Sequence, residues 1–128
     1  ISSTIGEISR CFYESLTLKF RKKLSNLQEL IGKKVEVVYL IGGGIQNKLL
    51  CQWIADALGI SVIAGPSETT SVGNLIFQLK AGGFISSVQE GRKLCENSFD
   101  IRLYEPQDTE YWNEKYQKFL RVISKNLN

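Results

Sequence analysis

Three consecutive glycines, Gly42-Gly43-Gly44, constrain the fold of this chain more than any other stretch. An apolar run of strand length, residues 38–41, precedes them, and the apolar residues after Asn47 recur at helical spacing. Residues without Cβ let the backbone take positive φ and let a ligand approach closely, and the free N–H groups at a helix start favour negative charge. The stretch is therefore typical of a strand–loop–helix turn that binds an anion such as phosphate.

Two well-known phosphate-binding turns do not fit this stretch. A P-loop requires GxxxxGK followed by Ser or Thr, which does not occur in the chain. A dinucleotide fingerprint requires a third glycine where Asn47 stands and an acid at the tip of the next strand, where Gly65-Pro66 stands. Two interpretations remain open on the pattern alone: a mononucleotide turn that ends in Asn47, or a tight connection without a ligand in which Asn47 is only a helix N-cap.

The glycine turn lies inside a predicted strand–helix–strand unit. Residues 35–41 form the first strand, and their apolar character at most positions favours a sheet covered on both faces. The helix ends at Gly59 and has one apolar face, made of Leu49, Leu50, Trp53, Ile54, Ala57 and Leu58. Residues 60–64 form the second strand. Connections this short predict a parallel βαβ unit in which the two strands lie side by side.

Helices are predicted on both sides of this unit. Thr4 and Glu7 read as a capping box for a long amphipathic helix that Gly32 ends. Further helices are predicted over residues 68–81 and 86–96 and from 108 or 109 onward, with an extended segment at 101–104. Gly73 interrupts the first of these at a cost in helix propensity, which indicates that a neighbouring backbone or a ligand needs the space. The predicted fold class is α/β, with a βαβ core and flanking helices.

Composition and charge exclude several classes of function. The chain has 128 residues, a net charge of +3 and no histidine. This charge is too small, and the basic residues too scattered, for nucleic-acid binding, and no apolar run is long enough to cross a membrane. Without histidine there is no Ser–His or Cys–His nucleophile. The three cysteines have neither disulfide nor metal-site spacing, and no carboxylate spacing demands Mg²⁺, so we expect no metal site and a reducing cytoplasm.

The turn and the segments around it resemble a known family. An apolar strand, Gly42-Gly43-Gly44, two residues, Asn47, and a helix ending in Ala55-Asp56-Ala57-Leu58-Gly59 together look like the carboxy-terminal domain of the FGGY carbohydrate kinases. Ala64-Gly65-Pro66, Glu68 and Gly73-Asn74 are similar to the rhamnulokinase branch, as are Arg10-Cys11 and Glu14-Ser15-Leu16. The resemblance covers residues 6 to 104.

The resemblance implies a fold and a set of site residues. The fold is actin-like, built from two ribonuclease-H-like domains with ATP and sugar between them, and residues 1–128 would be the nucleotide-binding carboxy-terminal domain. Gly43 and Gly44 would offer backbone to the ATP phosphates, Asn47 would contact the adenine side, and Gly42 would start the turn. Glu68 and Gly73 fall near the nucleotide in the family. On the residues alone, Glu68 is more simply a helix-start acid and Gly73 a packing glycine.

The same resemblance implies an incomplete enzyme. The chain begins at Ile1 without Met, so we expect a piece of a longer protein, preceded by the sugar-binding domain and by the aspartate that acts as general base. No catalytic residue is expected in this chain, which alone should be inactive, and sheet edges left uncovered could pair with another chain. The complete enzyme would use ATP and Mg²⁺ to phosphorylate a sugar, L-rhamnulose to L-rhamnulose 1-phosphate. The alternatives are another ketose such as xylulose or fuculose, or a free-standing Rossmann-like nucleotide-binding module.

Overall fold

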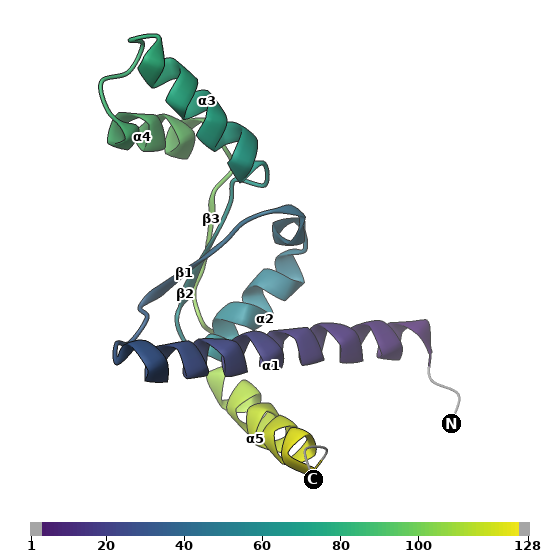
Figure 1. Ribbon diagram of the computed structural model, residues 1–128. Helices are drawn as coiled ribbons and strands as arrows, with labels where there is room; N and C mark the ends of the chain where they lie inside the picture. Colours follow the sequence, from purple (N-terminus) through teal and green to yellow (C-terminus); the bar gives the residue numbers. More distant parts are fainter. Residues whose placement is uncertain (1–3, 126–128) are drawn as a thin grey trace.

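The computed structural model of the chain describes residues 4–125, in which helices lie at both ends of a small sheet and along one side of it (Figure 1). In chain order the elements are α1 (Ile5–Ile31), β1 (Val37–Leu40), the 3₁₀ turn η1 (Gly43–Gln46), α2 (Lys48–Leu58), β2 (Ser61–Ala64), α3 (Thr69–Ala81), α4 (Val88–Ser98), β3 (Arg102–Tyr104) and α5 (Thr109–Lys125). The predicted helices and strands are confirmed. The capping box of Thr4 and Glu7 is present, and Gly32 and Gly59 end their helices in the left-handed conformation.

The sheet has the order β1-β2-β3. Strand β1 pairs in parallel with β2, which confirms the βαβ unit, and β2 pairs in antiparallel fashion with β3, which was not predicted. The register places Leu40 beside Ala64 and Ala64 beside Arg102. The end of β1, the end of β2 and the start of β3 therefore lie together at one end of the sheet, next to the glycine turn.

One face of this sheet is covered by α2, and the other is exposed within residues 4–125. Val38, Leu40 and Val62 pack against α2, whereas Tyr39 and Leu103 are 67% and 60% exposed. The prediction of a sheet covered on both faces is wrong for the described residues, since helix α2 lies against only one side of the apolar strand β1. Leu49 also differs from prediction, because it lies on the exposed side of α2.

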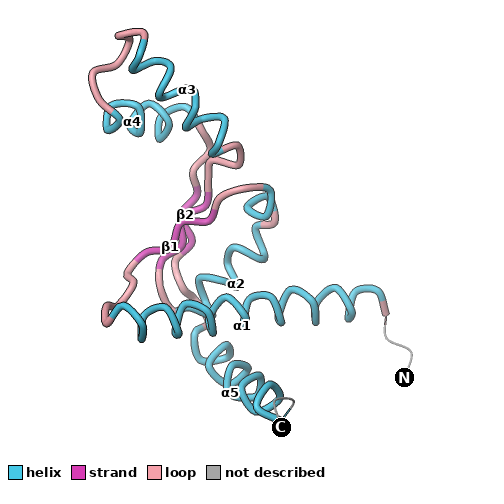
Figure 2. Tube along the Cα trace, in the orientation of Figure 1, coloured by secondary structure: helices cyan, strands magenta, loops and turns pink. Residues whose placement is uncertain are grey.

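A second apolar cluster joins helices α1, α2 and α5 at the end of the sheet opposite to α3 and α4 (Figures 1 and 2). Its buried members are Leu18, Ala57, Trp112 and Tyr116. The indole rings of Trp53 and Trp112 lie 5.6 Å apart between α2 and α5, a contact distance typical of aromatic pairs. Helix α2 is therefore held between the sheet and the α1–α5 pair, which fixes the direction in which its amino end points.

Helices α3 and α4 form a separate pair beyond the carboxyl ends of β1 and β2 (Figure 1). They pack at Gly91, where an added Cβ would lie 2.6 Å from Cγ2 of Ile76. No atom lies within 4 Å of a Cβ added at Gly73. The interpretation of Gly73 as a packing glycine is therefore wrong, and Gly91, which sequence reasoning passed over, has that role. Nearness of Gly73 to a nucleotide stays a prediction.

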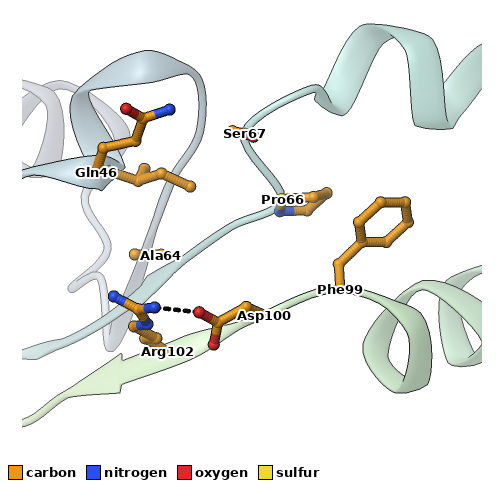
Figure 3. A pocket seen from close by; sticks show the side chains of 8 residues that line it. Gln46, Ala64, Pro66, Ser67, Phe99, Asp100 and Arg102 are labelled. Atoms are coloured by element: carbon orange, nitrogen blue, oxygen red, sulfur yellow. Dashed lines mark hydrogen bonds and ion pairs between the residues drawn. The ribbon is translucent and has the colours of Figure 1, made fainter.

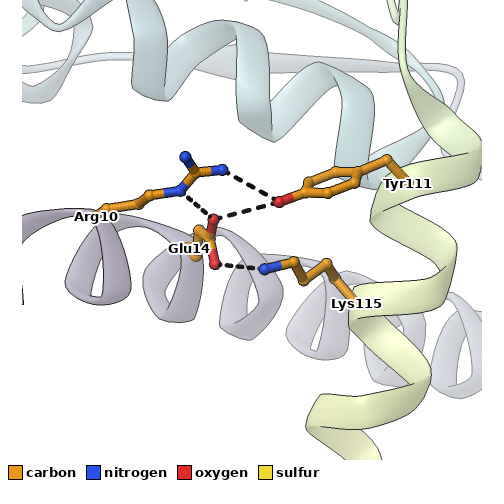
Figure 4. A network of polar contacts seen from close by, with 4 residues as sticks. All are labelled: Arg10, Glu14, Tyr111 and Lys115. Carbon is orange, nitrogen blue, oxygen red and sulfur yellow. Dashed lines mark hydrogen bonds and ion pairs between the residues drawn. The ribbon is translucent and has the colours of Figure 1, made fainter. Parts of the chain in front are cut away.

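A polar network holds α5 against α1 (Figure 4). Glu14 accepts hydrogen bonds from Arg10 Nε at 2.8 Å and from Lys115 Nζ at 3.0 Å, and Tyr111 Oη accepts one from Arg10 at 3.2 Å. Partial burial raises the pKa of Glu14, whereas the hydrogen bonds from Arg10 and Lys115 lower it. The two hydrogen bonds together have the larger effect, so the pKa lies below its usual value. The carboxylate is thus charged at neutral pH and joins the two helices.

Replacing Glu14 by Gln should lower the free energy of unfolding by about 1 kcal/mol at neutral pH, because two charge-assisted hydrogen bonds are weakened at a largely buried position. A carboxyl group with a lowered folded-state pKa stabilises the protein above its unfolded pKa, and this contribution is lost as the pH falls through the folded pKa. Denaturant unfolding should therefore show that the free energies of unfolding of Glu14→Gln and of the unaltered protein become more similar below about pH 4.5, the ordinary pKa of glutamate. Glu29→Gln at an exposed position of α1 is the control. An equal loss in both variants would contradict the prediction.

Candidate functional site

The glycine turn begins at Gly42, whose backbone has φ 86° and ψ −174°. Residues with a Cβ rarely adopt this region, so Gly42 is required for the direction in which the chain leaves β1. Gly43 and Gly44 then open the 3₁₀ turn η1, with hydrogen bonds from Ile45 N to Gly42 O at 3.3 Å and from Asn47 N to Gly44 O at 3.2 Å. The glycines therefore do not lead straight into the α-helix, as the simplest strand–loop–helix pattern suggests, because one tighter turn lies between them.

The N–H groups of Gly43 and Gly44 have no backbone partner within residues 4–125. They are the first donors of a 3₁₀ turn, which have no carbonyl before them inside the turn. Both residues are exposed, and no atom lies within 4 Å of a Cβ added at either position. The turn therefore carries two adjacent exposed residues whose backbone donors have no backbone partner in the described part of the chain.

Asn47 is the N-cap of α2. Its Oδ1 accepts a hydrogen bond from Leu50 N at 3.1 Å, as the ligand-free interpretation predicts. This bond uses the side-chain oxygen and leaves the Nδ2 group, a donor of two hydrogen bonds, without a partner in the described part of the chain. The cap and a ligand contact are therefore compatible, since they use different atoms of one amide.

A small pocket of about 190 Å³ lies beside the turn, at the carboxyl end of β2 (Figure 3). It is lined by Ile45, Gln46, Ala64, Pro66, Ser67, Phe99, Asp100 and Arg102. Gly65 holds the β2–α3 loop close to the chain before β3: its N–H donates to Leu40 O at 3.0 Å, and a Cβ there would lie 3.0 Å from Asp100 O. Segments from η1, the β2–α3 loop and the start of β3 thus meet around this pocket.

The charges of this pocket come from a single ion pair. Arg102 Nη2 donates to Asp100 Oδ2, and both side chains are accessible, at 40% and 68% exposure. The hydrogen bond from Arg102 lowers the pKa of Asp100 below its ordinary value, so its carboxylate is ionised at neutral pH. Beneath the turn, burial raises the pKa of the Cys51 thiol, whose Sγ donates to Ile45 O. Cys51 is therefore a neutral packing residue and not a nucleophile.

The other two predicted site residues are not part of the turn. Glu68 is the N-cap residue of α3, and its side chain makes no capping hydrogen bond there. Gly73 lines a larger, mostly apolar pocket of about 610 Å³ between the sheet and the α3–α4 pair. The structure thus brings Gly42, Gly43, Gly44 and Asn47 into one turn, whereas Glu68 and Gly73 are on the neighbouring helix.

Four polar residues of the small pocket were missed by sequence reasoning, namely Gln46, Ser67, Asp100 and Arg102. Asp100 and Arg102 could have been found from their place at the beginning of the extended segment 101–104, since Asp100 directly precedes it and Arg102 lies within it. Antiparallel pairing of this segment with β2 puts its start beside the end of β2. Within residues 4–125, no group of three or more Asp, Glu, Cys or His side chains is arranged to hold a metal ion.

The chain matches the family model described as "FGGY family of carbohydrate kinases, C-terminal domain" over residues 1–82. Curated relatives include a rhamnulokinase of Bacteroides thetaiotaomicron, 42% identical over 92% of this chain and 24% of the relative. A rhamnulokinase of Bacillus subtilis is 34% identical over 100% of this chain and 26% of the relative. The chain thus spans about a quarter of the length of the curated relatives it matches.

Two solved structures share the fold. The Plasmodium falciparum glycerol kinase crystallised with ADP has a TM-score of 0.79 at 17% identity, covering 100% of this chain and 26% of that one. The xylulose kinase from Rhodospirillum rubrum has a TM-score of 0.70 at 21% identity, covering 98% and 25%. These likenesses confirm the predicted sugar-kinase fold. In the described part of the chain, every helix is too short or too polar to span a membrane.

Proposed function

This chain belongs to the FGGY family of carbohydrate kinases, and we propose that residues 1–128 form part of the nucleotide-binding domain of an ATP-dependent sugar kinase. The observation that carries this proposal is the glycine turn, in which two adjacent exposed residues have N–H donors without a backbone partner beside a capped helix start. Such donors suit phosphate oxygens, and the dipole of α2 adds a favourable field. The family membership makes a free-standing Rossmann-like module the weaker alternative.

We assign the site residues as follows. The backbone N–H groups of Gly43 and Gly44 bind phosphate oxygens of ATP or of its product ADP, and Gly42 sets the direction of the turn. The side chain of Asn47 lies toward the base and donates from Nδ2. Glu68 and Gly73 remain secondary candidates, and of the two only Gly73 lines a pocket.

The proposed reaction transfers the γ-phosphate of ATP to a hydroxyl of a ketose. The names of the curated relatives favour L-rhamnulose, with L-rhamnulose 1-phosphate as the product. Phosphoryl transfer depends on positioning and on neutralising the phosphate charge, for which Mg²⁺ is the usual ion. The described residues contain no cluster of metal ligands, so we assign no residue to Mg²⁺ here. We also assign no general base to this chain, and place the catalytic aspartate in the sugar-binding part of the enzyme.

Two further properties are proposed, an exposed sheet edge that pairs with another chain and a cellular location. In the described chain the outer edges of β1 and β3 have no strand beside them, so either edge could pair with another chain. We also propose a location in the cytoplasm, which the proposed use of ATP and the cysteines without disulfide spacing support.

The proposal is tested by assaying the full-length gene product with ATP, Mg²⁺ and a panel of ketoses that includes L-rhamnulose, xylulose and fuculose. We expect ADP release to depend on the ketose and to be fastest with L-rhamnulose, whereas the 128-residue chain alone should show none. A reaction without ketose measures ATP hydrolysis and is subtracted. Preference for xylulose or fuculose would change the assigned sugar, and the absence of ketose-dependent ADP release would contradict the kinase proposal.

A further inference from the structure

We propose that the face of the sheet opposite α2, together with the large pocket between the sheet and the α3–α4 pair, is the surface on which the remaining part of the full-length kinase packs. This inference rests on the proposed function, in which residues 1–128 are one part of a longer enzyme. We call this surface the open sheet face. It is formed by Tyr39, Ile63 and Leu103 of the three strands and by Ile41 and Phe77 at the pocket.

The three strands place a row of apolar side chains on the open sheet face. Tyr39 is the register partner of Ile63, and Ile63 is the partner of Leu103. Partners in register lie on one face of a sheet, and successive residues of a strand alternate between faces, so Val38 and Val62 lie on the other face, against α2. Strands that are apolar on both faces are typical of a sheet covered on both sides. The exposed row therefore indicates a cover that lies outside the described residues.

The large pocket continues this apolar row toward α3. It has a volume of about 610 Å³, and Tyr39, Ile41 and Phe77 line it while 67%, 59% and 63% exposed. Its charged lining residues, Arg92 and Glu96, have opposite signs. The lining thus has no excess of positive charge, which a highly anionic ligand such as a nucleotide would require. Contiguous exposed apolar surface of this kind matches a protein segment with apolar side chains.

Gly73 marks a place where this segment approaches closely. It lines the pocket from inside α3, and no atom of the described chain lies within 4 Å of a Cβ added there. Glycine inside a helix is unfavourable relative to alanine, and nothing within residues 4–125 compensates for it. The absence of a Cβ lets another backbone come into contact with the helix. The glycine therefore fits a contact made by a part of the protein that packs into the pocket.

The rest of the same polypeptide is the occupant to which the comparisons point. The rhamnulokinases of Bacteroides thetaiotaomicron and Bacillus subtilis are matched over 24% and 26% of their length, so about three quarters of such an enzyme is not represented in this chain. A segment of the same polypeptide is present at a high effective concentration. A second copy would first have to overcome the loss of translational and rotational freedom on association.

Thiol labelling of the full-length gene product tests this inference. Tyr39→Cys and Leu103→Cys each place a thiol on the open sheet face, and Leu30→Cys is the control on α1, where Leu30 is 84% exposed. The two thiols on the open sheet face should react with a maleimide at least about tenfold more slowly than the control, because a thiol inside a packed interface reacts only when that interface opens. Mass spectrometry of the digested protein measures each site separately from the three native cysteines. Labelling in urea should be equally fast at all three sites.

A second pair of variants tests the contact at Gly73. Gly73→Leu adds a side chain that lines the pocket, and Ser71→Leu adds the same side chain at an exposed position of α3 outside the pocket lining. Combined with Tyr39→Cys, Gly73→Leu should speed the labelling of the thiol about tenfold, because the added side chain keeps the covering segment away. Ser71→Leu should leave the labelling rate unchanged. Equal effects of the two leucines would contradict the close approach at Gly73. If Gly73→Leu does not fold, the single cysteine variants provide the result.

The outcomes separate this inference from the proposed function. Labelling at Tyr39→Cys and Leu103→Cys as fast as at Leu30→Cys would overturn the inference. So would protection that requires ATP and ketose, which would assign the pocket to a ligand, or protection that is lost on dilution to a monomer, which would assign the face to a second copy. Ketose-dependent ADP release by the unaltered protein is measured separately. Release with fast labelling would leave the kinase proposal in place, and slow labelling without release would leave a covered sheet face in a protein that is not a kinase.

Discussion

Replacing Gly44 by alanine should weaken ATP binding by about ten- to a hundredfold, while the protein stays as stable as before or gains about 0.5 kcal/mol. The backbone at Gly44 is outside the positive-φ region, and a Cβ there meets no atom within 4 Å, so the fold accepts the methyl group. The open space that it fills is the space proposed for a phosphate. Calorimetry gives the Kd for ATP, and denaturant unfolding gives the stability.

Gly42→Ala is the matched variant, because it adds the same methyl group two residues earlier. With φ 86° and ψ −174°, alanine at this position is strained by about 1–3 kcal/mol, although no neighbouring atom obstructs its Cβ. We expect a loss of stability of this size, and weaker ATP binding because the turn is displaced. Unchanged ATP affinity in Gly44→Ala would remove the phosphates from this turn. Equal destabilisation of the two variants would show that the glycines serve the backbone alone.

The contrast between these glycines also shows what the sequence could predict. Three glycines after an apolar strand indicate a sharp turn with accessible backbone, and local periodicity with Gly32 and Gly59 places the helices around it. Such signals are local, because the residues that determine a helix or a turn are neighbours in the chain. They do not show which of the three glycines has the positive φ that only glycine adopts easily, because the three residues are identical in the sequence.

The missed features are those that depend on contacts between distant segments. The closeness of Asp100 and Arg102 to Gln46 depends on the antiparallel pairing of β3 with β2, and the short extended segment 101–104 does not by itself predict its pairing partner. The roles of Gly73 and Gly91 were likewise settled by packing: Ile76 contacts the position of Gly91, and nothing contacts that of Gly73. The residues of β1 are apolar on both faces and do not show which face a helix covers. That depends on the position of α2, which lies against one face only.

Asn47 is either only a helix N-cap or also a nucleotide contact, and these two interpretations predict different effects of its substitution on ATP binding. Replacing it by alanine removes the oxygen that accepts from Leu50 N, and should lower the free energy of unfolding by about 1 kcal/mol. It also removes the Nδ2 donor, so the KM for ATP should rise about tenfold, while the KM for the sugar stays the same. This variant alone does not separate the two roles, because a weakened helix start could also disturb the turn.

Asn47→Asp separates the two roles, because aspartate keeps the capping oxygen and loses the donor. Its charge at the start of α2 is favourable, so the stability should equal or exceed that of the unaltered protein. The KM for ATP should nevertheless rise at least as much as in the alanine variant, because the donor is gone and a negative charge faces the nucleotide. If Asn47 were only a cap, the KM for ATP would follow stability, with the alanine variant impaired and the aspartate variant normal. A stable aspartate variant with a raised KM for ATP and an unchanged KM for sugar would place the Asn47 side chain next to the nucleotide, because loss of the cap does not explain it.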